Sequence, residues 1–338
     1  MRLYCGIDLH SNNSFIVIID EDDKVVCRQR QPNDLDVILA TLEPYRDDLV
    51  GVVVESTFNW YWLVDGLEDS GFRVHLANTT AIQQYSGLKY ADDSTDARWL
   101  AHLLRLGILP TGYIYPREQR ALRDLLRKRI SLVQLRTSNK LSLQNLSQRN
   151  LGRRFSSSEL KSLNTEGIQE RLDDGNLVLA MDSTLQVTAC LDQEIQRLER
   201  EIRIQTRPHP AFEPLKSVCG VGNVLAQTIL LETGEIGRFP SVGNYASYCR
   251  CVGSQRLTNY KSKGKGNTKN GNRYLAWAYV EAANFAIRYY PEIKRYYQRK
   301  AARTHRIVAL KTVAHKLARA SYYVMRDLQP FELKRAFG

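Results

Sequence analysis

The chain has few cysteines and no long apolar run. It contains no run of about 18 or more apolar residues, the length that a membrane-spanning helix needs. Six cysteines are too few for a disulfide scaffold, and the isolated Cys249-x-Cys251 pair is a poor zinc motif. Residues 1–6 lack the pattern of a secretory signal. These absences predict a cytoplasmic protein with reduced thiols and no membrane partner.

Acidic residues are scarce in the last quarter of the chain. The whole sequence holds 48 Lys and Arg against 36 Asp and Glu, a net charge of +12. Residues 253–338 contain 19 Lys or Arg and only 4 Asp or Glu, so they carry +15 and the rest of the chain carries −3. Such a basic segment, with Tyr, Trp and Asn between its cations, favours a nucleic-acid partner. A merely solubilising cationic surface is the alternative.

The first hundred residues alternate between strand-like and helix-like patterns. Runs of β-branched and apolar residues predict strands at 4–9, 14–20, 24–28, 50–55 and 73–77. Helical patterns follow at 34–45 and 60–70. An initial meander followed by alternating units predicts a mixed sheet flanked by helices, an α/β fold.

The remainder of the chain is predicted to be helical. Apolar residues recur at spacings of three and four over 118–148 and 176–204, which predicts either an antiparallel coiled-coil hairpin or two surface helices of a bundle. Ser156–Ser158 and Gly167 predict a mobile tip between these helices. Residues 252–271, rich in Gly, Lys and Asn, predict an exposed loop. The predicted domains are 1–115, 116–206 and 207–338.

Four acidic residues stand out by their context. Asp8 lies inside an otherwise apolar strand, and Glu55 ends the apolar run 50–54. Asp93 and Asp96 lie three residues apart at the start of a predicted helix, and therefore on one face of it. Carboxylates suit Mg²⁺, and two such ions about 4 Å apart assist phosphoryl transfer. The pattern predicts that the four carboxylates meet at one sheet edge around divalent cations.

Each of these residues also has a purely structural explanation. Asp93 could cap its helix with Asp96 as its partner in the first turn. Asp8 and Glu55 could be ordinary polar residues at strand ends. The four positions alone leave both interpretations open, although the structural one needs four coincidences beside a strongly basic segment.

Several motifs resemble those of a known family. Gly6-Ile7-Asp8, Val54-Glu55-Ser56-Thr57 and Asp93-Ser94-Thr95-Asp96-Ala97-Arg98 resemble the Asp-Glu-Asp-Asp, RuvC-like domain of insertion-sequence family 110 transposases, which are pilin-invertase-like recombinases. Leu215-Lys216-Ser217-Val218-Cys219-Gly220-Val221-Gly222 and Lys269-Asn270-Gly271-Asn272-Arg273-Tyr274-Leu275 resemble later blocks of that family. The resemblance spans nearly the whole chain. It implies an RNase H/RuvC-like mixed-sheet domain, a coiled-coil helical hairpin and a helical C-terminal transposase domain.

The later blocks also carry the predicted nucleic-acid contacts. Gly220-Val221-Gly222 resembles a helix-hairpin-helix turn, whose backbone N–H groups can hold a phosphate. Lysines of the exposed loop could neutralise a scissile phosphate or simply bind the backbone nonspecifically. The predicted nucleic-acid-binding residues are Gly220, Gly222, Lys261, Lys263, Lys265, Lys269 and Arg273.

In this family a serine in the loop before the C-terminal block is the proposed nucleophile. The matching position here is Thr258, in Arg256-Leu257-Thr258-Asn259. Threonine offers the same hydroxyl with an added methyl group, so attack is possible but more crowded. Three alternatives stay open: Thr258 attacks, the chain is disabled at this step, or Ser262 attacks. A solvated loop threonine is the structural alternative.

The resemblance implies an RNA-guided DNA transposase/recombinase of an insertion sequence. Donor and target DNA strands would be cleaved and exchanged through a covalent protein–DNA intermediate, with Mg²⁺ or Mn²⁺ held by Asp8, Glu55, Asp93 and Asp96. A structured guide (bridge) RNA, a dimer of dimers and a location at the bacterial nucleoid are implied by the resemblance alone. A metal-dependent junction nuclease and a catalytically silent nucleic-acid-binding relative are the alternatives.

Overall fold

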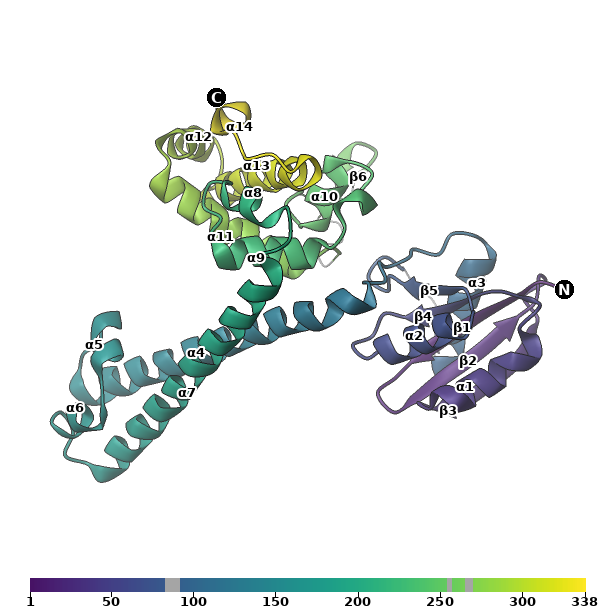
Figure 1. The fold of residues 1–338 in the computed structure, drawn as a ribbon, viewed down its shortest axis with the longest axis horizontal. Helices are drawn as coiled ribbons and strands as arrows, with labels where there is room; N and C mark the ends of the chain where they lie inside the picture. Colours follow the sequence, from purple (N-terminus) through teal and green to yellow (C-terminus); the bar gives the residue numbers. More distant parts are fainter. Residues whose placement is uncertain (83–91, 254–256, 265–269) are drawn as a thin grey trace. The chain divides into compact units, whose positions relative to one another are not determined.

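The computed structural model describes residues 1–82, 92–253, 257–264 and 270–338. They form two compact units (Figure 1). One comprises Met1–Arg117 with Ser254–Asn270, and the other comprises Glu118–Gly253 with Gly271–Gly338. Within the described ranges, no helix is both long and apolar enough to cross a membrane. The predicted division into three domains stays a prediction.

The first unit is built on a five-stranded mixed sheet, which confirms the predicted α/β part of the fold. The sheet order is β3-β2-β1-β4-β5. Strand β1 pairs antiparallel with β2 and parallel with β4, and β4 pairs parallel with β5. The strand bounds are Leu3–Leu9 (β1), Asn13–Ile19 (β2), Val25–Pro32 (β3), Leu49–Glu55 (β4) and Val74–Ala77 (β5).

Alternation along β1 divides its side chains between the two faces of the sheet. The odd positions Leu3, Cys5, Ile7 and Leu9 are buried in one core with residues of α1 (Leu35–Leu42) and α2 (Tyr61–Asp69). Tyr4 is buried in another core with residues of α3 (Asp93–Arg105). Asp8 is also at an even position, so it lies on the face that α3 covers.

Gly6 allows α3 to lie directly on β1. A Cβ atom at this position would lie 2.0 Å from the Ala97 carbonyl oxygen and 2.8 Å from the Ala101 backbone nitrogen. Any larger side chain would therefore push the helix away from the strand. Because α3 begins at Asp93, this close contact also determines how near the start of the helix comes to the end of β1.

Two long helices begin the second unit. Helix α4 (Arg117–Leu151) and helix α7 (Gly175–Thr206) confirm the helices predicted over 118–148 and 176–204. Arg129 of α4 pairs with Glu199 of α7, and Arg136 Nη1 lies 2.6 Å from Asp192 Oδ1. The partners run in opposite directions along the two helices, so α4 and α7 are antiparallel.

The predicted mobile tip between these helices is a packed element instead. It contains helix α5 (Ser157–Ser162) and helix α6 (Thr165–Gln169). Ser156 and Glu159 form a complete capping box at the start of α5. The apolar side chains of the tip are buried against the two long helices, in a core made of Leu143, Phe155, Leu160, Ile168 and Met181.

The C-terminal part of the second unit is a helical bundle around α11 and α13. Tyr245 and Tyr279 are fully buried there, and their hydroxyl oxygens lie 2.7 Å apart. Its helices are α8 (Phe212–Lys216), α9 (Asn223–Thr233), α10 (Val242–Tyr248), α11 (Arg273–Tyr289), α12 (Pro291–Ala301), α13 (Arg306–Asp327) and α14 (Leu333–Phe337). Short 3₁₀ turns occupy Glu43–Tyr45 and Ile236–Arg238.

Candidate active site

Asp8 is a carboxylate in the centre of the sheet. It lies near the end of β1, between β2 and β4, and only 3% of its surface is exposed. A buried carboxylate needs hydrogen bonds or a cation, because burial penalises its charged form. Its surroundings therefore decide what Asp8 can do.

Glu55 lies on the strand next to Asp8 in the sheet. It ends β4, which runs parallel to β1 with Val54 opposite Ile7. Burial, a hydrogen bond with the Asp8 side chain and the negative charges of Asp8 and Asp96 together raise the pKa of Glu55 to about 8. Without a cation, these surroundings therefore favour the protonated form of the Glu55 carboxyl group.

The start of α3 supplies the other two carboxylates. The side chain of Asp92 caps this helix, accepting hydrogen bonds from the Thr95 N–H at 2.7 Å and the Thr95 hydroxyl at 2.6 Å. The capping role considered for Asp93 therefore belongs to its neighbour. Asp93 and Asp96 remain in the first turn, on the side of the helix that reaches the end of β1.

A small cavity opens beside two of these carboxylates. It has a volume of about 300 Å³ and is lined by Glu55, Asp96, Trp99, Leu100, Thr79 and Ile82. Glu55 and Asp96 thus face one space, and the negative charge of Asp96 contributes to the raised pKa of Glu55. The four residues Asp8, Glu55, Asp93 and Asp96 are called the acidic cluster below.

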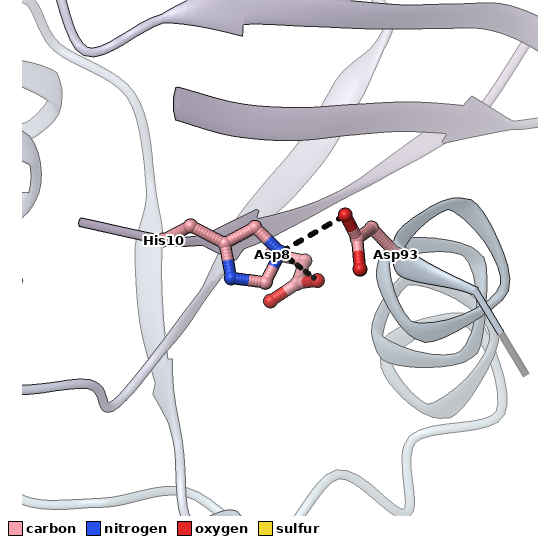
Figure 2. Close-up of side chains that lie close together, drawn as sticks. All are labelled: Asp8, His10 and Asp93. Carbon is pink, nitrogen blue, oxygen red and sulfur yellow. Dashed lines mark ion pairs between the residues drawn. The ribbon is translucent and has the colours of Figure 1, made fainter. Parts of the chain in front are cut away.

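His10, which lies between the predicted strands 4–9 and 14–20, joins the acidic cluster although no sequence motif singled it out. Its Nε2 atom lies 3.2 Å from Asp8 Oδ2 and 3.2 Å from Asp93 Oδ2 (Figure 2). The available sequence signal was its position two residues after Asp8, because alternate residues of an extended chain share a face. His10 therefore connects the strand carboxylate to the helix carboxylate.

This set of side chains fits a divalent cation. Asp8, His10 and Asp93 each offer one ligand atom, and these atoms lie within 4.8 Å of one another. The like charges that raise the pKa of Glu55 are the kind of repulsion that a bound cation relieves. The described residues are thus compatible with a divalent metal without selecting its identity.

Thr258 lies on a short β-hairpin formed by residues 257–262, called the Thr258 hairpin below. Strands β6 (Leu257–Thr258) and β7 (Lys261–Ser262) pair antiparallel, with Thr258 opposite Lys261. Asn259 and Tyr260 both have positive φ values, 49° and 58°, as in a type I′ turn. The segment predicted as an exposed loop therefore contains a short hairpin, on whose first strand Thr258 is exposed.

The predicted cationic residues differ in their surroundings. Lys261 and Lys263 are exposed in and beside the Thr258 hairpin. Arg273 begins α11, is exposed, and donates a hydrogen bond to the Tyr274 hydroxyl at 2.9 Å. Lys265 and Lys269 lie outside the described residues.

A buried ion pair fixes the start of α11, just after the basic loop. Arg127 donates to both carboxylate oxygens of Glu232 at 2.6 and 2.7 Å, and the Glu232 side chain is fully buried. Asn272 Nδ2 donates to the same carboxylate at 2.7 Å, while Asn272 Oδ1 caps α11. This network connects α4, α9 and α11.

Gly220 has a packing role that the sequence did not reveal. Its φ is +81°, and a Cβ atom would lie 2.1 Å from the Ala282 carbonyl oxygen of α11. Gly222 is the N-cap residue of α9 and a Cβ there would meet no atom within 4 Å. Gly220 therefore allows the turn between α8 and α9 to contact α11, and nucleic-acid binding by the two glycines stays a prediction.

Two family models, both of transposases, match the chain: one covers the acidic cluster and the other covers the Thr258 hairpin. A family model described as a transposase matches residues 5–149, and the model of the transposase IS116/IS110/IS902 family matches residues 213–298. Together they cover about two thirds of the sequence. The chain belongs to the IS110 family of transposases. The first match contains the whole acidic cluster and His10, and the second contains Thr258 and Arg273.

Two relatives agree with membership of the IS110 family. The chain is 25% identical over 166 residues to the "Insertion element IS110 uncharacterized 43.6 kDa protein" of Streptomyces coelicolor, covering 48% of this chain and 41% of that protein. It is 23% identical over 292 residues to the "Probable family 20 transposase" of Pseudomonas aeruginosa, covering 84% of this chain and 83% of that protein. The chain thus matches less than half the length of the Streptomyces relative.

Proposed function

We propose that this IS110-family chain is a DNA transposase/recombinase that cleaves and exchanges donor and target DNA strands. The observation that supports the proposal is that the Glu55 carboxyl group hydrogen-bonds the Asp8 side chain and is close enough to Asp96 for its charge to affect the pKa of Glu55. The basic segment 253–338, with its net charge of +15, suits a DNA substrate. The mixed sheet and its covering helix α3 support an RNase H/RuvC-like assignment for the first unit.

The acidic cluster would bind Mg²⁺ or Mn²⁺ through Asp8, Glu55, Asp93 and Asp96. When bound, such a cation supplies positive charge that polarises a phosphoryl oxygen. In the proposed reaction, Thr258 Oγ1 would form a bond to the scissile phosphorus, while the bond from that phosphorus to one sugar oxygen would break. The hydroxyl proton leaves to a base, and the departing sugar oxygen is protonated. The product is DNA esterified to Thr258.

Lys261 is suited to assist Thr258. Residues directly opposite in an antiparallel pair have Cβ atoms about 4.5–5.5 Å apart, and Thr258 is paired with Lys261. The ammonium group can therefore reach a phosphate next to the Thr258 hydroxyl and offset its negative charge. Lys263, Lys265, Lys269 and Arg273 are proposed as further DNA-backbone contacts.

A second surface, with more basic than acidic residues, supports a nucleic-acid partner. A cavity of about 600 Å³ in the second unit is lined by Lys316, Arg319, Arg326 and Arg335 beside Tyr296 and Tyr323, and by the acidic residues Asp327 and Glu332, of which Asp327 pairs with Arg326. Cations together with aromatic rings suit phosphates and unpaired bases. We propose guide-RNA binding and a dimer of dimers from the family resemblance. Sequencing of RNA that copurifies after expression with the flanking element DNA tests the RNA partner.

Trapping of a covalent complex tests the proposed nucleophile. Wild-type protein with Mg²⁺ and a labelled element-end DNA is expected to give a protein–DNA adduct that survives denaturing electrophoresis. Thr258→Ser is expected to retain this adduct and Thr258→Ala to lose it. Tyr260→Phe and Ser262→Ala are the controls for neighbouring hydroxyls. An adduct that persists in Thr258→Ala but disappears in Ser262→Ala would transfer the role to Ser262.

A metal-dependent junction nuclease is the second candidate function. The acidic cluster supports it because all its members lie between residues 8 and 96, so the metal ligands need no residue of the Thr258 hairpin. Water would then attack in place of the hydroxyl. Cleavage that continues in Thr258→Ala without any adduct would favour the nuclease. Absence of both cleavage and adduct in the wild type would favour a silent relative.

A further inference from the structure

The Nε2 atom of His10 is one of several buried side-chain polar atoms, among the described residues, that make no hydrogen bond of standard geometry. Two carboxylate oxygens, Asp8 Oδ2 and Asp93 Oδ2, nevertheless lie 3.2 Å from it (Figure 2). The potential ligand atoms of Asp8, His10 and Asp93 all lie within 4.8 Å of one another. A bound cation would accommodate all three.

We propose that His10 Nε2 is a direct ligand of a divalent cation shared with Asp8 and Asp93. This inference rests on the proposed function in one respect: both place a divalent cation in the acidic cluster. Ligand atoms about 2.1 Å from an octahedral ion, in neighbouring positions, are about 3.0 Å apart. The observed separations of 3.2 Å are close to that spacing.

The backbone of His10 is held in place by three hydrogen bonds. Its carbonyl oxygen accepts from Asn33 Nδ2 and from Asn59 Nδ2, both at 2.9 Å. Its N–H donates to the Asn13 carbonyl oxygen, also at 2.9 Å. These bonds fix the main chain of His10 beside the acidic cluster, at a position from which the imidazole reaches Asp8 and Asp93.

A nitrogen ligand changes which ion the cluster prefers. Mg²⁺ is a hard cation that favours oxygen ligands, whereas imidazole suits later divalent metals better. Replacing one oxygen ligand by His10 should therefore shift the preference from Mg²⁺ toward Mn²⁺. The cluster becomes a mixed nitrogen–oxygen site rather than one made of carboxylates alone.

Metal binding to the full-length, metal-free protein tests this assignment. Calorimetric titration gives the affinities for Mn²⁺ and Mg²⁺, and pulsed electron paramagnetic resonance of bound Mn²⁺ detects a directly coordinated nitrogen. In His10→Ala we expect the nitrogen coupling to disappear and the Mn²⁺ affinity to fall by about tenfold or more. The Mg²⁺ affinity should change by less than about threefold, since its remaining ligands are oxygens.

His102→Ala is the matched control. This histidine belongs to the same unit and also lies near a carboxylate, with Nδ1 2.8 Å from Asp23 Oδ1, but outside the acidic cluster. The His102→Ala substitution should leave the nitrogen coupling and the Mn²⁺ and Mg²⁺ affinities unchanged. His10→Gln provides a second variant if His10→Ala melts at a lower temperature, because it keeps the side-chain bulk without the imidazole.

The outcomes of the metal-binding experiment separate an error in the His10 assignment from an error in the proposed function. Bound Mn²⁺ without nitrogen coupling in the wild type, or equal Mn²⁺ affinity in wild type and His10→Gln, would overturn the role of His10. The proposed transposase site would then survive if Asp8→Asn still lost metal binding. A wild type that binds neither ion would overturn both the His10 assignment and the metal chemistry of the proposed function.

Discussion

The acidic cluster and the Thr258 hairpin have different roles in the proposed reaction, and they differ in burial: Asp8 of the cluster is buried, whereas Thr258 of the hairpin is exposed. Asp8 is buried in the central strand of a five-stranded sheet, and α3 is pressed onto that strand at Gly6. Thr258 lies at the end of a two-residue strand, beside a Tyr260 that is 98% exposed. Metal ligands must be held in a narrow geometry, whereas a residue that joins DNA must be reachable. The two regions fit these two demands.

Asp8→Asn should have the largest effect on catalysis. Loss of the buried carboxylate removes a ligand from the acidic cluster, and metal assistance contributes several kcal/mol to such reactions. Single-turnover cleavage in Mg²⁺ should therefore fall by about 10³-fold or more. Thr258→Ser should stay within about tenfold of the wild type. Asp8→Asn protein that retains a tenth of the wild-type rate would remove Asp8 from the mechanism.

Glu232→Gln tests whether the segment after the Thr258 hairpin depends on a rigid anchor. Arg127 and Asn272 both donate to this fully buried carboxylate. Because Glu232 is fully buried while Arg127 is 31% exposed, weakening the charged hydrogen bonds of Glu232 should cost about 1.5–3 kcal/mol, which urea unfolding of the second unit should detect. Glu199→Gln is the control, because the Glu199 side chain is 31% exposed and its pair with Arg129 should contribute about 1 kcal/mol or less.

Gly6→Ala tests the contact that holds the acidic cluster together. The new methyl group would lie 2.0 Å from the Ala97 carbonyl oxygen, so α3 must move or the first unit must unfold more easily. The free energy of unfolding should fall by about 1–3 kcal/mol. Chemical denaturation monitored by tryptophan fluorescence measures this change. Gly175→Ala is the control, since a Cβ there meets no atom within 4 Å. Equal stabilities of the two variants would refute this role of Gly6.

The pH dependence of stability reports on crowding in the acidic cluster. Burial and the neighbouring Asp8 raise the pKa of Glu55 from 4.5 to about 8. The native state therefore binds more protons than the unfolded state between these pH values, and stability should fall as pH rises through this window. Thermal melts in a chelator should show this decline. Glu55→Gln should reduce it, whereas an unchanged slope would contradict the assignment.

Tyr260→Ala should have the smallest effect. Its side chain is almost fully exposed at the turn of the Thr258 hairpin, so the free energy of unfolding should change by about 0.5 kcal/mol or less. Chemical denaturation measures this change. A larger loss would mean that the hairpin packs against something, and the contrast with the buried acidic cluster would be weaker than described.

Much of the fold could be predicted because local patterns and final burial agree. The run 50–54 is apolar throughout, and β4 is covered on both faces. The long helices α4 and α7 were visible from their spacing of apolar residues. Residues 156–159 carried a capping box, Ser-x-x-Glu, that could have predicted α5, but the serine cluster around it favoured a loop.

The acidic cluster was harder to predict because its geometry depends on long-range contacts. The cap considered for α3 was one residue too late in the chain, since Asp92 rather than Asp93 caps the helix. His10 was overlooked because a polar residue after a strand is typical of turns. Its proximity to Asp93 arises only when α3 packs on β1, a contact between residues more than 80 positions apart that no local pattern encodes. The metal and nucleophile roles stay predictions.

The carbonyl oxygen of His10 restricts insertions and deletions in two loops of the first unit. The carbonyl oxygen of His10 accepts one hydrogen bond from the Asn33 side-chain amide, in the loop before α1, and another from the Asn59 side-chain amide, in the loop before α2. An inserted residue between Glu55 and Asn59 would displace the second amide by up to about 3.5 Å, beyond the range of a hydrogen bond. Both loops should therefore resist insertions and deletions even though they lie at the surface, where loops normally tolerate them.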